Sequence, residues 1–274
     1  MTDSADKTGS KQAASYRALL VEGRDGVEWL TLSRPKRLNA IDPTMAAELI
    51  DYFGRLSERH DVRVVVLRGA NGQFCSGFDL GSVEDITSSV AHGLRMQRQM
   101  ANIVLHMRRC PQPIIALIEG AACGAGFALA LAADVRYASE DARMNVAMAR
   151  IGLTGCDMGI SYFLPRAVGS SSAAELMMGG RFVDAARALR IGLVSDVMTN
   201  ESLAAAAEVL AAEMTNMSPV GLRLTKEGLA FGQDAGSLEA AIAMEDRGQV
   251  LCIGPFMSEG VSAFREKRKP LYPD

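Results

Sequence analysis

The stretch IEGAACGAGFA, from Ile118 to Ala128, decides the fold of this chain. It begins at the end of an apolar, β-branched run at residues 114–118 and then changes to glycine and alanine. That change is typical of a buried strand that turns directly into a closely packed helix. Backbone N–H groups at the start of such a helix lack intrahelical acceptors, so this turn can polarise an acyl oxygen.

A second segment of the same character lies about forty residues earlier. FCSGFDL, residues 74–80, follows the expected strand VRVVVLRG at residues 62–69. Glycines after a buried strand commonly serve only tight turning and close helix packing. Two such turns in one chain favour a further interpretation, a two-pronged oxyanion hole built from backbone donors.

Four segments together resemble the crotonase superfamily, the enoyl-CoA hydratase and isomerase group. They are SRPKRLNAI (33–41), FCSGFDL, EGAACGAG (119–126) and IGLTGCDMG (151–159), and the resemblance extends from about residue 16 to the C-terminus. It implies an α/β fold, a crotonase-like spiral of ββα units followed by a helical C-terminal module. It also implies a homotrimer or a dimer of trimers, because the C-terminal helices of the family pack across subunits.

Composition is compatible with a globular, acyl-CoA-binding chain. The 274 residues are 49% hydrophobic, which is enough for one large core and argues against disorder. A net charge of −3 provides no general attraction to nucleic acid, and no lysine-rich helix supports the RNA association known for one branch of the family. No apolar run is long enough to span a bilayer, so we expect no membrane partner.

The five cysteines form no CxxC pair and have no histidine at a spacing typical of a zinc site. We therefore expect no metal ion, reduced thiols and a cytoplasmic location. Residues 1–15 are polar and lack an apolar signal region, which predicts a flexible N-terminal tail.

Three regions are expected: the tail at 1–15, the spiral core at 16–199, and a helical trimerisation and CoA-closing module at 200–274. Asp42 and Pro43 predict the cap and first position of a helix at 43–59. A polar segment at 81–91 is expected to form a loop over the site. The other expected strands are 16–22, 27–32, 114–118, 135–138, 143–146 and 194–198. A helix is expected to follow the loop at 81–91 and to end near residue 109. The other expected helices are 124–134, 158–167, 171–178, 201–215, 219–231, 236–251 and 255–267.

The resemblance assigns the two oxyanion donors to the main-chain N–H groups of Phe78 and Ala125. Such donors are effective because a thioester enolate carries charge on its oxygen in a dry cleft. The Phe78 side chain is interpreted either as a wall of the acyl pocket or as an ordinary core aromatic.

The chain departs from the hydratases of the family at their two catalytic glutamates, which hold and deprotonate the added water. The matching positions are Ala128 and Met148, with Ala149 as an alternative for the second because the loop differs in length. None of these side chains can transfer a proton.

Asp157 is the remaining acid near these motifs, and its loop is similar to one that carries an aspartate in dienoyl isomerases and in an aromatic dehalogenase of the family. The loop here is one residue longer. The aspartate is predicted to be a general base, a proton shuttle or a carboxylate nucleophile, or else only the N-cap of the following helix. Glu119 and Asp134 are expected to cap or pair structurally.

Coenzyme A requires cations for its phosphates, and Arg34, Lys36 and Arg37 are candidates, with exposed solubility charges as the alternative. The resemblance also assigns Phe264 and Lys267 to closure of a nucleotide site in the same or a neighbouring subunit. A solvated basic tail is the other interpretation. The remaining expected substrate contacts are Ser76, Asp79, Leu80, Gly124 and Met148.

These observations predict an acyl-CoA-processing enzyme of the enoyl-CoA hydratase/isomerase type, with Asp157 as acid and base. Coenzyme A is expected to enter as part of the substrate, without a separate cofactor. Two alternatives remain: an aspartate-dependent acyl-CoA hydrolase or dehalogenase-like enzyme, and a catalytically silent acyl-CoA-binding module.

Overall fold

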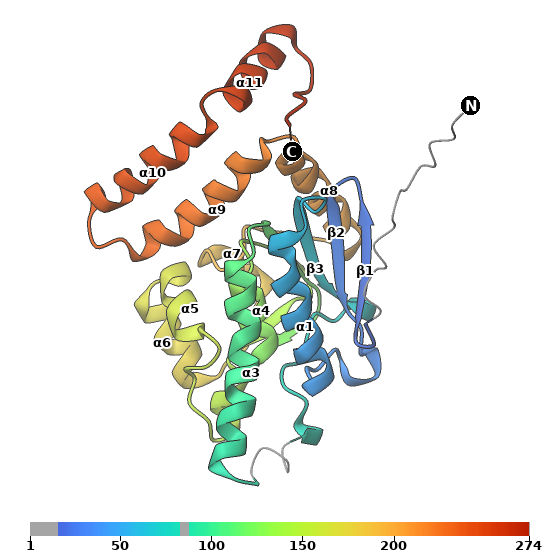
Figure 1. Ribbon diagram of the computed structural model, residues 1–274. Helices are drawn as coiled ribbons and strands as arrows, with labels where there is room; N and C mark the ends of the chain where they lie inside the picture. The colour runs from blue at the N-terminus through green and yellow to red at the C-terminus, as the bar shows by residue number, and fades with distance from the viewer. Residues whose placement is uncertain (1–15, 83–87, 274) are drawn as a thin grey trace.

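The computed structural model describes residues 16–82 and 88–273 of the chain (Figure 1). The predicted tail at 1–15 and the middle of the predicted loop over the site, residues 83–87, lie outside the described residues.

A six-stranded sheet with the order β1-β2-β3-β4-β6-β9 forms the centre of the molecule. β1 and β2 form an antiparallel hairpin, and each later neighbouring pair in the sheet is parallel. Its strands are β1 (Leu19–Arg24), β2 (Val27–Leu32), β3 (Val64–Gly69), β4 (Ile114–Ile118), β6 (Val135–Ser139) and β9 (Asp196–Met198). A smaller sheet contains β5 (Ala121–Cys123), β7 (Arg143–Asn145) and β8 (Val183–Asp184). The predicted mixed α/β class is confirmed.

Helices cover both faces of the large sheet, as the alternation of side chains along β3 requires. Val65 and Leu67 join the larger apolar cluster with α1 (Pro43–Arg55), α3 (Val90–Arg109) and α4 (Ala125–Ala132). Val64 and Val66 point to the other face and pack with α8 (Asn200–Thr215). The predicted region 200–274 therefore begins with a helix that lies against the sheet.

Local signals fix several helix boundaries. The Asp42 side chain accepts a hydrogen bond from the Met45 N–H, which confirms the predicted cap, with Pro43 at the first position. The predicted helix at 43–59 ends earlier, at Arg55, and a 3₁₀ turn, η2 (Leu56–Glu58), follows it. The other short or intermediate elements are η1 (Pro35–Arg37), η3 (Ala70–Gly72), η4 (Leu80–Ser82), η5 (Ala147–Ile151), α5 (Ile160–Val168), α6 (Ser170–Gly179) and α7 (Ala185–Arg190).

The three last helices form an arm that extends away from the large sheet (Figure 1). They are α9 (Pro219–Asp234), α10 (Leu238–Cys252) and α11 (Pro255–Glu266). The arm holds a cavity of about 930 Å³ lined mainly by apolar side chains and glycines of these helices. No described residue of α10 is buried. No described helix combines the length and the apolarity that crossing a membrane would require.

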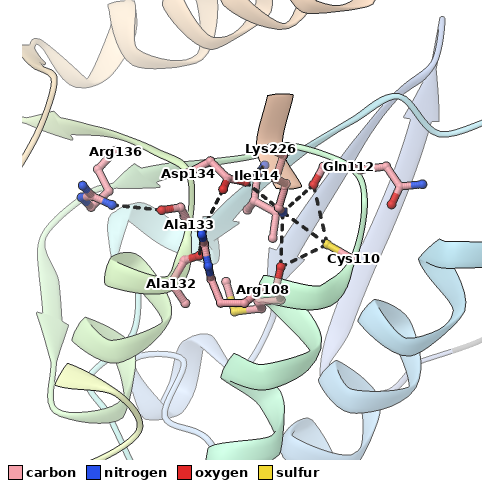
Figure 2. A network of polar contacts seen from close by, with 10 residues as sticks. Arg108, Cys110, Gln112, Ile114, Ala132, Ala133, Asp134, Arg136 and Lys226 are labelled. Carbon is pink, nitrogen blue, oxygen red and sulfur yellow. Dashed lines mark hydrogen bonds and ion pairs between the residues drawn. The ribbon is translucent and has the colours of Figure 1, made fainter. Parts of the chain in front are cut away.

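Lys226 anchors the arm to the core (Figure 2). Its side chain is only 5% exposed, and its ammonium group lies 2.9 Å from a carboxylate oxygen of Asp134. The same ammonium donates to the carbonyl oxygens of Gln112 at 2.8 Å and Met107 at 3.3 Å. A buried lysine is tolerated when its charge is paired and its donors are satisfied, as they are here.

Asp134 is the centre of this network. One of its oxygens accepts from Arg108 at 2.8 Å, and the other accepts from the Ile114 N–H at 2.8 Å. The predicted structural role of Asp134 is confirmed, because its carboxylate joins α3, β4 and α9. At the far end of α9, Asp234 accepts a hydrogen bond of 2.7 Å from Tyr162 of α5.

Replacing Lys226 with alanine is expected to lower the free energy of unfolding by about 3 kcal/mol, because two buried carbonyls and a carboxylate oxygen lose their common donor. Urea denaturation followed by circular dichroism measures this loss. Glu227→Ala, an exposed neighbour on the same helix, is the matched control and should change stability little. Equal stabilities of the two variants would contradict the anchoring role.

Candidate functional site

The two glycine-containing motifs lie side by side. Cys75 pairs with Ala122 of β5: its N–H donates to Ala121 O at 2.8 Å, and its carbonyl accepts from Cys123 N at 2.9 Å. This pairing carries the segment 74–80 along the strand that leads into α4. Segments far apart in the sequence thus meet where that helix begins.

Two glycines allow this close approach. A Cβ atom at Gly126 would lie 2.3 Å from the Cys75 carbonyl oxygen, a distance at which the backbone would have to move. A Cβ atom at Gly77 would lie 2.8 Å from Cys123 O and 3.6 Å from Ala125 N. Gly77 also has φ +108°, which a side chain rarely adopts. The turn before Phe78 is therefore in direct contact with the start of α4.

The predicted donors, Phe78 N–H and Ala125 N–H, have no hydrogen-bond acceptor within the described part of the chain. Ile41 lies beside Phe78 but donates to Gly77 O at 2.7 Å and accepts from Asp79 N at 2.9 Å. These bonds leave the Phe78 N–H unused. Ala125 is the first residue of α4, where N–H groups lack intrahelical partners. The site thus contains two unpaired backbone donors on adjoining segments.

Asn39 fixes the first motif, SRPKRLNAI, against the segment before Phe74. Its side chain is completely buried and accepts from the Arg34 N–H at 3.0 Å. Its amide donates to Ala70 O at 3.0 Å and to Gln73 O at 2.6 Å. All three bonds are to backbone atoms, so this asparagine sets the path of the loop.

Arg34, a predicted partner of the coenzyme A phosphates, is paired with two carboxylates of the protein. Its guanidinium donates to Asp79 at 2.9 Å and lies 3.2 Å from Asp42. Partial burial of Asp79 acts to raise its pKa, but hydrogen bonds from the Gly81 N–H and Arg34 outweigh this effect and hold the pKa below its ordinary value. Asp79 is therefore a paired carboxylate at neutral pH.

The other predicted contacts on this side of the site surround η1. Lys36 and Arg37 lie in η1 and are exposed. Ser76 donates its N–H to Leu38 O at 3.0 Å and its hydroxyl to Arg37 O at 3.4 Å, which joins the two motifs. Leu80 is exposed at the start of η4.

Ala128 and Met148, the positions that the resemblance matches to two glutamates, lie in α4 and η5. Ala128 is fully buried in α4, and Met148 is buried in η5. Gly124, with φ +51°, donates its N–H to Asn145 O at 3.0 Å, and this bond holds the chain that enters η5 against α4. Neither Ala128 nor Met148 provides a group that can exchange a proton.

Two thiols lie in the paired segments. Burial raises the pKa of Cys75 to about 12 and that of Cys123 to about 11. Both thiols remain protonated near neutral pH, and a protonated thiol is a poor nucleophile.

Asp157 lies in the loop before α5, and the interpretation of this residue as the N-cap is wrong. The helix begins at Ile160, its N-cap is Gly159, and no side chain caps it. The Asp157 carboxylate instead accepts a hydrogen bond from the side-chain amide of Gln97, on α3. No motif in the sequence singles out Gln97, but it lies one helical turn before the buried Met100 on α3, a spacing that places both residues on one face.

Phe264 and Lys267 are not brought to this site within the chain. Phe264 is 85% exposed on α11, and Lys267 is the exposed C-cap of the same helix. α11 lies at the outer end of the arm, away from α4 (Figure 1).

Comparisons with known proteins agree in their family. The family model described as enoyl-CoA hydratase/isomerase matches residues 22–274. A Mycobacterium tuberculosis protein named "Probable enoyl-CoA hydratase EchA12" is 40% identical, over 98% of this chain and 98% of that protein. The 1,2-epoxyphenylacetyl-CoA isomerase of Escherichia coli K12 is 31% identical, over 90% of this chain and 95% of that protein. The crystal structure of an enoyl-CoA hydratase from Polaromonas sp. JS666 superposes on this chain with a TM-score of 0.88. The two sequences are 30% identical, and the match covers 94% of this chain and 100% of that chain.

Gly126→Ala is expected to lower the melting temperature strongly and to abolish activity, because the added methyl group would force α4 away from Cys75. Thermal denaturation and a turnover assay measure these effects. Gly228→Ala is the matched control: a Cβ there meets nothing within 4 Å, so the helix should gain up to about 1 kcal/mol. A Gly126→Ala variant with unchanged melting temperature and activity would contradict the close approach.

Proposed function

The chain belongs to the enoyl-CoA hydratase/isomerase family, and we propose that it stabilises a thioester enolate with the N–H groups of Phe78 and Ala125 while Asp157 transfers the proton. It is an acyl-CoA enzyme of the hydratase/isomerase type. The observation that carries the proposed mechanism is the meeting of two unpaired backbone donors on adjoining segments.

The two donors act on the charge that develops during reaction. Removal of a proton next to a thioester carbonyl moves negative charge onto its oxygen. Fixed N–H groups aimed at that oxygen stabilise the charge without having to reorganise, and each contributes roughly 3 kcal/mol. Backbone donors suit this task because the fold fixes them, whatever the side chains at positions 78 and 125.

Migration of a double bond is the reaction that this site favours. Hydration requires acids that hold and activate a water molecule, and Ala128 and Met148 occupy the positions expected for them. Isomerisation needs only one group that removes a proton from the carbon next to the carbonyl and returns it further along the chain. Asp157 can perform both transfers as a carboxylate and then as a carboxylic acid.

Two other functions remain as second candidates, one enzymatic and one without catalysis. An aspartate that attacks the substrate as a nucleophile would give an acyl-CoA hydrolase or a dehalogenase-like enzyme. A silent acyl-CoA-binding module is favoured only by the absence of glutamate at positions 128 and 148.

The coenzyme A part of the substrate is proposed to bind to cations at the surface. Lys36 and Arg37 are exposed cations beside the first motif, suited to the phosphates of coenzyme A, which enters as part of the substrate without a separate cofactor. Phe264 and Lys267 would close the nucleotide site of a neighbouring subunit. The five free thiols favour a reducing, cytoplasmic location.

The proposed assembly is a homotrimer or a dimer of trimers. α10 supports it, because this helix exposes Leu238, Val250 and Leu251 and has no buried residue among those described. Large apolar side chains exposed along one helix are consistent with an interface between proteins.

Asp157→Asn is expected to reduce turnover by at least about 10²-fold, because an amide cannot accept and return the proton. The assay incubates the protein with enoyl-, dienoyl-, hydroxyacyl- and aryl-CoA thioesters and analyses the products by liquid chromatography and mass spectrometry. An isobaric product with a shifted retention time identifies isomerisation, a gain of water identifies hydration, and free coenzyme A identifies hydrolysis.

Asp25→Asn, in the hairpin turn between β1 and β2, is the matched control and should retain full activity. Full turnover by Asp157→Asn would remove the assigned acid. Substrate binding without any product in the wild type would favour the silent module.

Size-exclusion chromatography with light scattering should give a mass of about three or six times 29.2 kDa. Val250→Glu should shift the population toward smaller species, because the charge would be buried in the interface. The control Arg247→Ala, on the same helix, should leave the mass unchanged. A monomeric wild type would contradict the proposed assembly.

A further inference from the structure

The contact between α3 and the loop before α5 extends the site beyond its family motifs. We propose that Gln97 is a positioning residue that holds one carboxylate oxygen of Asp157 and leaves the other free to exchange the substrate proton. This inference rests on the proposed function of Asp157 as the acid and base.

The backbone around Asp157 is fixed by its neighbours. Met158 has φ +45°, a conformation that residues other than glycine rarely adopt, and Gly159 has φ +83°. The Met158 side chain is only 5% exposed and belongs to the large apolar cluster, which holds this conformation. The carbonyl of Asp157 accepts from Ile160 N at 2.8 Å and closes the turn into α5. The carboxylate therefore starts from a well-defined backbone but is not tied to the end of the helix.

Gln97 is also carried by a rigid element. α3 starts with a side-chain cap, in which Ser89 accepts from the His92 N–H, and its residues Met100, Ile103, Val104 and Met107 are buried. Gln97 precedes Met100 by three residues and Val104 by seven, so it extends their face toward the loop of Asp157. The Gln97 side chain therefore lies at the N-terminal end of the apolar face of α3.

Only one of the two carboxylate oxygens of Asp157 takes part in the contact with Gln97. The Gln97 side-chain Nε2–H₂ donates to Oδ1 of Asp157, whereas Oδ2 has no hydrogen-bond partner within residues 16–82 and 88–273. An amide cannot take up or lose a proton near neutral pH, so it holds Oδ1 without competing for the substrate proton. One fixed oxygen restricts rotation of the carboxylate, and the free oxygen remains available to act as base and then as acid.

The contact is at the surface, where a single hydrogen bond contributes little to folding. Its main effect is on orientation, and a small misplacement of a catalytic group can cost about 10²-fold in rate. A positioning residue should therefore change kcat more than KM or the melting temperature.

Steady-state kinetics of Gln97→Leu, on the substrate that the wild type converts, tests the proposal. We expect kcat to fall by about tenfold to hundredfold, with KM within about twofold and an unchanged melting temperature. Gln97→Glu keeps the length of the side chain but places a carboxylate against Asp157, and it should lower kcat further. Gln99→Leu, the same change two residues away on α3, is the matched control and should retain wild-type kinetics.

Asp157→Asn is measured in parallel so that the two ideas can fail separately. If Asp157→Asn loses turnover and Gln97→Leu matches the wild type, the inference is overturned and the proposed function stands. If Asp157→Asn retains full turnover, the assigned acid is wrong and the inference fails with it. A Gln97→Leu variant that raises KM at unchanged kcat would also overturn the proposal, because it would show a binding role.

A double variant gives the last check. If Gln97 acts only through Asp157, the residual rate of Gln97→Leu combined with Asp157→Asn should equal that of Asp157→Asn alone. A further tenfold loss in the double variant would overturn the positioning role.

Discussion

The close approach of α4 to the segment 74–80 is the constraint on which the site depends. The N–H and the carbonyl of Cys75 both form hydrogen bonds with β5. Gly126 lies so near the Cys75 carbonyl oxygen that a methyl group at Gly126 would not fit. This packing brings the turn before Phe78 into contact with the N-terminus of α4. The donors of the proposed oxyanion hole are therefore a consequence of backbone packing, and they need no particular side chain.

Much of the fold was predictable from local patterns. The strands at 27–32 and 114–118 have the predicted bounds, and Asp42 caps the predicted helix, because β-branched runs and caps act over a few residues. The start of α5 was misplaced because Met158 adopts a left-handed conformation that only its burial in the core sustains. The anchoring of the arm by Lys226 could not be predicted, since it depends on Asp134, on the Met107 carbonyl of α3 and on the Gln112 carbonyl after that helix. Tertiary contacts decide such features.

The candidate site shows the same division. Its glycine turns and its missing glutamates were visible in the sequence, because each is a property of a short motif. The ion pairs of Arg34 could not be predicted, because its neighbours in the sequence give no sign that Asp79 and Asp42 lie within reach of its guanidinium. Gln97 was missed because its partner lies on another element, although its place on the apolar face of α3 was readable. The backbone donors thus follow from short motifs, whereas the contact of the Asp157 carboxylate with Gln97 depends on tertiary structure.

The most direct test of the central claim is isotope-edited infrared spectroscopy of a saturated acyl-CoA whose thioester carbonyl carries carbon-13. A saturated substrate binds without a double bond to move, so the carbonyl reports only its hydrogen bonds. If the Phe78 and Ala125 N–H groups polarise the carbonyl, its stretching frequency in the complex should lie below that of the free thioester in water. A bound thioester with the frequency of the free one would contradict the account.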